Sequence, residues 1–296
     1  MKGTLSLDEV VRALDSYFRV PDVRGDDWSD IYELLYPEPY WRDFAEPGYE
    51  GRWNGLVVRG GDEVERAVTC VFPSNEIVAA LPPRTLLFSE HPIAFDDDVE
   101  GFAPLARSSF ERLQAEASAF YHVHAPLDQH PEIAPSRLVA EGLGLSGLEE
   151  YFPIAEGIPG GAAVIGDSAL TVDELAERLR SFLGPEIPVD VLSRPRERAG
   201  RVAVVAGGGA ERPILGASLE RGCETFVTGN AATRCRLQFV QESVREFRGL
   251  ADDAGVAVVD GTHYGLEKPP QLAMVDWFRR LGLPAEFRPG RPERAS

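Results

Sequence analysis

Apolar and polar residues alternate in short blocks along this chain, and the blocks predict strands that alternate with helices. Continuous apolar runs of roughly four to eight residues are typical of buried strands, and apolar positions three or four apart are typical of helices. The predicted strands are 65–72, 84–90, 117–124, 201–207, 224–229 and 255–261. The predicted helices are 1–18, 101–117, 135–143, 172–183, 211–222, 232–253 and 267–282. This alternation predicts an α/β fold.

The second half of the chain repeats the first at an offset of 139 residues. A repeat of this length indicates a duplicated α/β unit, because solenoid repeats are shorter. We therefore expect two pseudo-symmetric α/β halves, residues 1–148 and 149–296, with a ligand site between them. The aligned positions are the strand ends 87–89 and 226–228, followed by His124 with His263 and Asp128 with Glu267.

Two further segments have a distinctive composition. Residues 144–170 are rich in Pro and Gly, which predicts either a loop or hinge between the halves or a pair of strands with turns. The last ten residues, 287–296, have the composition of a frayed tail.

The chain has 296 residues and a formal net charge of −18, which argues against nucleic acids and anionic membranes as partners. Its start lacks the apolar core of a signal peptide and no apolar run is long enough to span a bilayer, so we expect a cytoplasmic protein. Cys70, Cys223 and Cys235 include no C-x-x-C pair. We expect reduced thiols and no thiolate metal site.

All five histidines fall in three short segments, and each segment also carries a carboxylate. Imidazole and carboxylate together are ligands for borderline-to-hard divalent metals. Because the segments follow predicted strands, and α/β sheets place ligands at the carboxyl ends of strands, the pattern predicts two half-sites for a pair of metal ions. The segments are SEHP (89–92, with His91), YHVHAPLDQH (121–130, with His122, His124 and His130) and GTHYGLEK (261–268, with His263).

The third segment has the spacing of a helical ligand pair. His263 and Glu267 share a face if a helix begins near 263–266, since residues four apart are neighbours on a helix. A solvated helix start with an acidic first turn is the alternative. In the second segment Pro126 predicts a turn instead of a helix. Asp128 is the candidate ligand there, with His124 as a second ligand or as its orienting partner.

The remaining candidates are less specific. Glu90 and His91 are adjacent, so both can bind one site only where the strand ends and the chain turns. His122 and His130 are candidates for a supporting role or proton transfer, or are structural histidines. Residues 207–209, three glycines, favour a tight turn over a phosphate-binding loop, because the motif lacks the Lys-Ser/Thr of a P-loop. No nucleophile motif is present, so the sequence identifies no catalytic residue.

Together these segments resemble the Nif-three-like family (NGG-one-interacting factor three), whose members are often described as GTP cyclohydrolase 1 type 2 homologues. LLFSEHPIAF is similar to that family's strand ending in His-His-Pro. YHVHAPLDQH is similar to its aromatic and His-x-Pro-Leu-Asp motif, and VTGN with GTHYGLE to its Thr-Gly and Gly-x-His-x3-Glu segments. Residues 54–58, NGLVV, also match, and the similarity spans roughly residues 50–285.

The resemblance implies a two-metal centre in two interlinked α/β halves with mixed sheets. One ion would be bound by His91, Asp128 and Glu267, and the other by Glu90 and His263 with Glu267 as the bridge. Glu90 stands where the family has its first His, which favours Mn, Fe or Mg over Zn at the second ion. Asn230 stands where the family often has Glu. The resemblance also implies homo-oligomers, specifically hexameric rings.

The motifs and the resemblance together suggest two alternative functions. The first is a dinuclear metal-dependent hydrolase of a small nucleotide-like or phosphorylated molecule, with Mn, Fe, Zn or Mg as the two ions and His122, His124 or His130 moving the proton. The second is a non-catalytic metal-binding oligomer: a metal store, metallochaperone or interaction protein.

Overall fold

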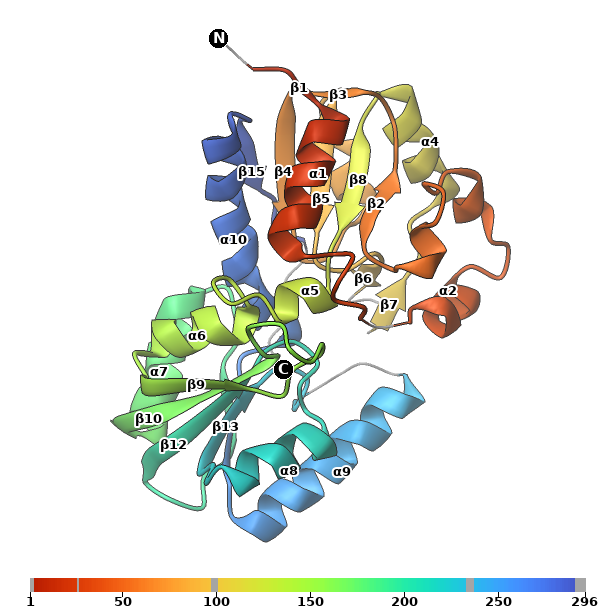
Figure 1. The fold of residues 1–296 in the computed structure, drawn as a ribbon. Coiled ribbons are helices and arrows are strands. Elements are labelled where there is room, and N and C mark those ends of the chain that lie inside the picture. The colour runs from red at the N-terminus through yellow and green to blue at the C-terminus, as the bar shows by residue number, and fades with distance from the viewer. Residues whose placement is uncertain (1–2, 26, 97–100, 233–236, 291–296) are drawn as a thin grey trace. The chain divides into compact units, whose positions relative to one another are not determined.

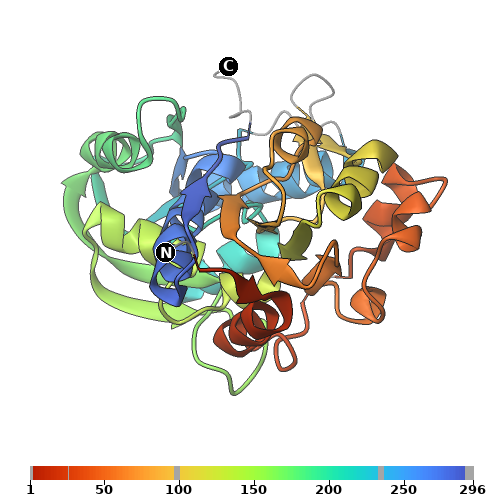
Figure 2. The same cartoon turned by 90° about the horizontal axis from the view of Figure 1, so that it is seen from above.

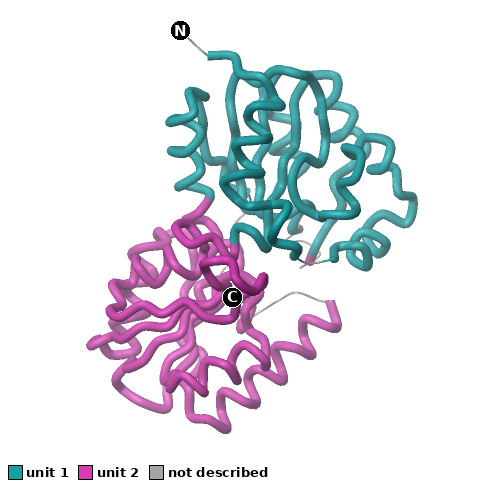
Figure 3. Tube along the Cα trace, viewed as in Figure 1, with its two compact units in different colours: residues 1–96, 102–127, 271–290 teal, residues 97–101, 128–270, 291–296 magenta. Residues whose placement is uncertain are grey.

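The computed structural model describes residues 3–25, 27–96, 101–232 and 237–290, and the chain forms two compact units (Figure 3). Unit 1 comprises residues 1–96, 102–127 and 271–290, and unit 2 comprises 97–101, 128–270 and 291–296. Each unit is an α/β layer structure built on a mixed sheet flanked by helices, which confirms the predicted fold class. The division differs from the predicted halves of 1–148 and 149–296, because the main part of unit 2 runs from Asp128 to Pro270 and residues 271–290 belong to unit 1.

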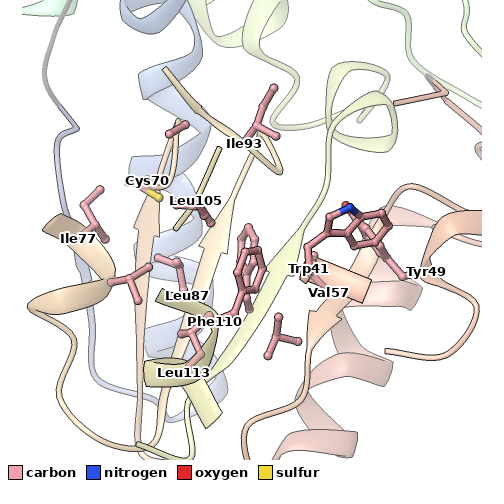
Figure 4. Close-up of a cluster of buried hydrophobic side chains, with 14 of the residues drawn as sticks. Trp41, Tyr49, Val57, Cys70, Ile77, Leu87, Ile93, Leu105, Phe110 and Leu113 are labelled. Carbon is pink, nitrogen blue, oxygen red and sulfur yellow. The ribbon is translucent and has the colours of Figure 1, made fainter. Parts of the chain in front are cut away.

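The sheet of unit 1 has four parallel strands and one antiparallel edge strand. Phe88 lies on one face, with ring centroids 5.8 Å from Phe18 of α1 (Leu7–Phe18) and 5.7 Å from Phe278 of α10 (His263–Leu281). The other face packs on α3 (Asn75–Ala79) and α4 (Arg107–Ala115) through a buried cluster that includes Leu87 and Phe110 (Figure 4). The sheet order is β15 (Ala285–Phe287), β4 (Arg66–Cys70), β5 (Thr85–Ser89), β8 (Ala119–His122) and β2 (Gly55–Val58).

An aromatic-rich segment between α1 and β2 completes unit 1. It consists of short helical pieces, α2 (Ser29–Leu35), η1 (Tyr40–Asp43) and η2 (Tyr49–Gly51). Figures 1 and 2 place α2 at the periphery of the unit, on the side of β2. Unit 1 is edged by two small strand pairs, β1 (Leu5–Ser6) with β3 (Glu63–Val64) and β6 (Ala94–Asp96) with β7 (Gly101–Ala103).

Unit 2 is built on a six-stranded sheet with helices on both faces. Phe226 of the sheet lies 5.2 Å from Phe247 of α9 (Gln238–Ala254), beside α8 (Arg212–Glu220). The helices α6 (Pro135–Leu143) and α7 (Val172–Leu183) pack against other sheet residues. The sheet order is β11 (Asp190–Ser193), β14 (Ala257–Asp260), β13 (Thr225–Thr228), β12 (Arg198–Val205), β10 (Ala163–Thr171) and β9 (Ser146–Tyr151).

The two sheets repeat one strand pattern. In unit 1, β4, β5 and β8 are parallel neighbours, and the preceding strand β2 lies antiparallel to β8. In unit 2, β12, β13 and β14 are parallel neighbours, and the preceding strand β11 lies antiparallel to β14. The duplicated pattern predicted from the sequence therefore recurs in the strand topology. It brings the carboxyl ends of three parallel strands to one edge in each unit.

Several predicted elements change at their ends. Residues 144–170 form the antiparallel pair β9–β10, the second of the two predicted alternatives. The helix predicted at 101–117 begins only at Arg107, after β7. The prediction of a frayed tail over residues 287–296 was wrong at its start. Phe287 pairs with Thr69 of β4, and the Arg288 N–H donates to the Thr69 carbonyl at 2.9 Å. Residues 291–296 lie outside the described part of the chain.

The described helices include none that is both long and apolar enough to cross a bilayer.

Candidate metal centre

His91 is held rigidly just after strand β5. Its backbone N–H donates to the Val71 carbonyl at 3.1 Å, and its own carbonyl accepts from the Ser89 hydroxyl. The imidazole stacks on Phe72 with ring centroids 4.2 Å apart and is 1% exposed. The backbone and the stacked ring together fix where this imidazole can present a nitrogen atom.

Trp28 gathers three imidazoles of unit 1 around one indole. The ring centroids of His91, His122 and His124 lie 6.0, 6.3 and 5.2 Å from the Trp28 ring, each edge-on to it. The rings of His91 and His124 are 4.9 Å apart. Two histidine segments separated in sequence thus meet at the carboxyl ends of neighbouring strands of unit 1. The clustering of histidines along the sequence did not point to Trp28, because only the fold brings its indole to the histidines.

The neighbours of His122 and His124 orient them differently. The Tyr49 hydroxyl lies 3.1 Å from His122 Nδ1, and both side chains are fully buried. The His124 backbone N–H donates to Asn54 Oδ1 at 2.8 Å, which fixes the main chain, and the His124 ring lies edge-on to Trp28. A contact such as that between the Tyr49 hydroxyl and His122 Nδ1 sets the tautomer and orientation of an imidazole.

Glu90 is fully buried and is reached by helix α10. Gln271 Nε2 donates to Glu90 Oε2 at 3.2 Å, and the Gln271 carbonyl accepts from the Thr69 hydroxyl at 2.9 Å. A buried carboxylate requires such hydrogen bonds, because desolvation strongly disfavours an isolated charge. Glu90 is therefore a buried carboxylate that Gln271 holds in place.

In unit 2, helix α10 begins at His263 and brings His263 and Glu267 together. His263 Nε2 lies 2.9 Å from Glu267 Oε1, and the two residues are 6% and 2% exposed. Asn230 Nδ2 lies 3.2 Å from His263 Nδ1, so this residue after β13 orients the ring from its other side. The predicted shared helix face of His263 and Glu267 is confirmed. The solvated helix start is wrong, because both side chains are buried.

The start of α10 is fixed by a buried acid. Asp260, at the end of β14, accepts hydrogen bonds from the backbone N–H groups of Thr262 and Ala232, each at 2.9 Å. Thr262 adopts the left-handed conformation with φ of 61°, and its hydroxyl accepts from the Gly265 N–H at 2.9 Å. Burial raises the pKa of Asp260, while these hydrogen bonds oppose the increase. The turn therefore delivers His263 as the first residue of the helix.

Gly207 provides the space for this pair. A Cβ atom on Gly207 would lie 2.1 Å from Glu267 Oε1 and 3.4 Å from His263 Nε2, and φ of Gly207 is +63°. Any larger residue would collide with the carboxylate and strain the backbone. The three-glycine segment after β12 is thus a turn shaped around the His–Glu pair.

The other predicted residues occupy distinct positions. Pro126 does not prevent a helix, because α5 (Ala125–Asp128) is a single turn with Pro126 in its second position, where proline is tolerated. Asp128 is half-buried at the end of this turn, and its role as a ligand stays a prediction. His130 Nδ1 accepts backbone N–H groups from Glu132 and Ile133 at 3.1 and 3.3 Å, so this nitrogen stabilises a turn.

Two of the three cysteines lie in the described part of the chain. Cys70 and Cys223 are buried free thiols. Burial raises the pKa of Cys223 to about 12 and that of Cys70 further still. Cys235 lies outside the described residues.

The donor chemistry of these side chains fits a divalent metal. His91 and His124 of unit 1 offer imidazole nitrogens, and Glu267 of unit 2 offers a carboxylate oxygen, and both are donor types that divalent metal ions accept. The side chains are buried or half-buried, their backbones are fixed by hydrogen bonds, and Gly207 keeps clear the position that a Cβ would fill. These are the features of a prepared ligand site.

Comparison with known proteins gives a consistent result. The family model described as "Duf34/NIF3 (NGG1p interacting factor 3)" matches residues 40–281. A "GTP cyclohydrolase 1 type 2 homolog" of Deinococcus radiodurans is 26% identical over 289 residues, covering 97% of this chain and 94% of the relative. A Nostoc protein of the same name is 27% identical, covering 75% of this chain and 80% of the relative.

Solved structures share the fold at lower identity. The protein ybgI, of unknown function, superposes with a TM-score of 0.66 and 19% identity, covering 98% of this chain and all of that one. Reduced HcgD from Methanocaldococcus jannaschii gives a TM-score of 0.62 at 18% identity, covering 98% and 99% of the two chains.

Proposed function

The chain belongs to the Duf34/NIF3 family, and we propose that it binds two divalent metal ions with the side chains that follow its parallel strands. The observation that carries this proposal is the buried His263–Glu267 pair, 2.9 Å apart, with Gly207 shaped around it. Burying an acid and an imidazole is costly, and a structural role would be filled as well by apolar residues. The proposed ligands are Glu90, His91, Asp128, His263 and Glu267, with His124 as a further ligand or orienting residue.

Helix α10 carries two of the proposed ligands, His263 and Glu267, and a residue that contacts a third. Gln271, which donates to Glu90, lies four residues after Glu267 on this helix, so the side chains of Glu267 and Gln271 are one turn apart on one face. We propose Mn, Fe or Mg over Zn at the Glu90 position, because a carboxylate oxygen is a harder donor than imidazole.

We further propose that the chain is a hydrolase of a small nucleotide-like or phosphorylated molecule. The relatives' name, GTP cyclohydrolase 1 type 2 homolog, supports this substrate class. When bound, divalent ions supply Lewis-acid chemistry and acidify water. His122 suits the role of accepting and returning the proton, because Tyr49 fixes its Nδ1 side and both residues are buried.

One observation favours a second function, metal binding without turnover in a homo-oligomer such as a hexameric ring. Glu90 replaces the family's first histidine and is hydrogen-bonded by Gln271, so the second ion site differs from the family pattern. Size-exclusion chromatography with light scattering tests the oligomer: a monomeric mass with metal bound would rule out the ring.

Metal analysis of the purified protein tests the common premise. We expect about two equivalents of divalent metal per chain, with at least one lost in Glu267→Ala and in Asp128→Ala. Glu246→Ala removes an exposed carboxylate from α9 and is the matched control, expected to retain the full metal content. Unchanged metal content in both ligand variants would refute the site.

A turnover screen then separates enzyme from store. The metal-loaded protein is incubated with GTP and with small phosphoesters under Mn, Fe, Mg and Zn, and products are followed by chromatography. Metal-dependent product that disappears in Glu267→Ala supports the hydrolase. Full metal loading without product under any ion favours the non-catalytic oligomer.

A further inference from the structure

The aromatic segment of unit 1 lines a partly open cavity of about 300 Å³ that the metal centre does not use. It is lined by α2, η1, η2 and the residues that join them, and we call it the aromatic cavity. Its four aromatic walls are Tyr32, Tyr36, Trp41 and Trp53. The volume is at the lower end of the range for small-molecule sites, so the cavity suits a small ligand or a single functional group.

The walls of the aromatic cavity are rigid. The Tyr32 ring lies 4.7 Å from Trp41, 4.9 Å from Trp53 and 5.2 Å from Tyr36. The Tyr36 hydroxyl accepts from the Leu105 N–H at 2.9 Å, which directs this polar group to the main chain. All four residues are less than 10% exposed, so packing within unit 1 restricts their side chains.

The charged lining is acidic overall. Arg42 donates to both oxygens of Glu50 at 3.0 and 3.1 Å, so these two charges offset each other. Glu33 also lines the cavity and leaves a net negative charge there, in a chain whose formal net charge is −18. The Arg42 guanidinium lies 5.3 Å from the centroid of the Trp41 ring, so one wall already accepts a cation on its face.

We infer that the aromatic cavity binds an organic monocation of the quaternary or tertiary ammonium class. The negative faces of Trp and Tyr rings attract cations, and several such rings around a cavity are a recognised way to hold a methylated ammonium group. The Glu33 carboxylate supplies the counter-charge, while the apolar walls disfavour a strongly hydrated ion such as a free metal. The net negative charge of the lining disfavours an anion.

This binding is independent of the proposed metal function. Trp53 lies 5.6 Å from Tyr49, and the Tyr49 hydroxyl contacts His122, so one layer of aromatic rings separates the aromatic cavity from the histidines. Ligand binding to the aromatic cavity can therefore be measured on metal-free or on metal-loaded protein. Loss of metal binding in Glu267→Ala leaves the cavity and its expected ligand affinity intact.

Choline and its neutral isostere 3,3-dimethyl-1-butanol are the probes. Isothermal titration calorimetry and tryptophan fluorescence of the full chain, at constant ionic strength, are expected to show saturable choline binding. The isostere should bind at least about threefold more weakly, since it lacks only the charge. Equal affinity for the two probes would show an apolar pocket and overturn the inference, as would no binding of either.

Charge variants locate the site. Glu33→Gln should weaken choline binding about threefold, because it removes a negative charge from the lining. Arg42→Gln should strengthen choline binding, because it removes a positive charge. Glu38→Gln is the matched control, an exposed acid of the same segment that does not line the cavity, and should have the smaller effect. Equal effects of Glu33→Gln and Glu38→Gln would place any binding elsewhere. Both positions are exposed, so these variants should fold.

Discussion

At the residue scale, Gly207 is the clearest case of a position where a side chain would occupy space that the His263–Glu267 pair needs. Gly207→Ala would place a methyl group 2.1 Å from Glu267 Oε1 in a backbone with φ of +63°, so the carboxylate or the turn must move. We expect a loss of about 1–3 kcal/mol in the free energy of unfolding. Metal affinity should fall at least about tenfold. Urea unfolding and metal titration measure the two effects.

Gly216→Ala is the control for that substitution. Gly216 lies inside α8 with nothing within 4 Å of its would-be Cβ, so alanine should leave metal affinity unchanged and stabilise the helix by up to about 1 kcal/mol. If both alanine variants bind metal like the parent protein, Gly207 has no part in shaping the site.

Tyr49 provides a second test at this scale, because its hydroxyl contacts His122 Nδ1. Tyr49→Phe should cost about 1 kcal/mol of stability and lower metal-dependent turnover about tenfold, since the imidazole proposed to move the proton loses its orienting partner. Tyr40→Phe also deletes a hydroxyl hydrogen bond, the one to the Leu105 carbonyl at 2.8 Å. It should lower stability alone, so equal turnover in the two variants would contradict the orienting role.

At the element scale, periodicity was most informative for amphipathic helices. The predicted 135–143 and 172–183 coincide with α6 and α7, because their ends carry local signals: Pro135 and Gly144 for one, the Thr171–Glu174 capping box for the other. The start of α10 was predicted at 267 by apolar pattern and at 263–266 by ligand spacing, and it lies at His263. The Asp260 hydrogen bonds that fix this start depend on tertiary structure.

The capping box of α7 predicts a pH-dependent stability. The Thr171 N–H donates to Glu174 Oε2 at 2.8 Å, and hydrogen bonds from Thr171 hold the pKa of Glu174 below its ordinary value of 4.5. A lowered carboxyl pKa contributes stability above pH 4.5 that is lost as the pH falls through the folded-state pKa. Thr171→Ala should cost about 1 kcal/mol at pH 7, and the difference should shrink in acid.

Ser74→Ala is the matched control for the capping box. The Ser74 hydroxyl caps α3 by accepting from the Ile77 N–H at 3.1 Å, with no carboxylate at that third position. Its cost in urea unfolding should therefore be the same at pH 7 and in acid. A Thr171→Ala cost that is equally independent of pH would show that Glu174 does not reinforce the cap.

The aromatic segment was the element that the sequence did not reveal. Residues 28–53 have neither strand nor long helical periodicity, and they form short helical pieces whose order comes from ring-to-ring packing among Tyr32, Trp41 and Trp53. This packing depends on contacts between residues that are well separated along the segment. A pattern of apolar positions does not specify such contacts. Trp28 and the aromatic cavity were missed for the same reason.

At the scale of the whole molecule, the repeat was the strongest sequence signal for fold and site together. It predicted two α/β sheets with ligands at strand ends, and each sheet contains a set of three parallel strands whose last member pairs with one antiparallel strand. What it could not predict was the return of the chain to unit 1. That return depends on the parallel pairing of β15 with β4, a contact more than 200 residues apart in sequence that has no counterpart in the repeat.

Because α10 carries Glu267 and continues into unit 1, a bound ion should stabilise the molecule as a whole. Ligand binding to the folded state alone adds about 2.7 kcal/mol at a free metal concentration 100 times Kd. We therefore expect chelation to lower the Tm by roughly 5–10 °C in differential scanning calorimetry, and restored Mn or Fe to reverse the change. Glu267→Ala should unfold at the chelated protein's temperature with or without metal, whereas Glu246→Ala should respond like the parent. A Tm that is insensitive to chelation, in a protein shown to have released its metal, would mean that the ion contributes nothing to folding and that the ligands are prepared without it.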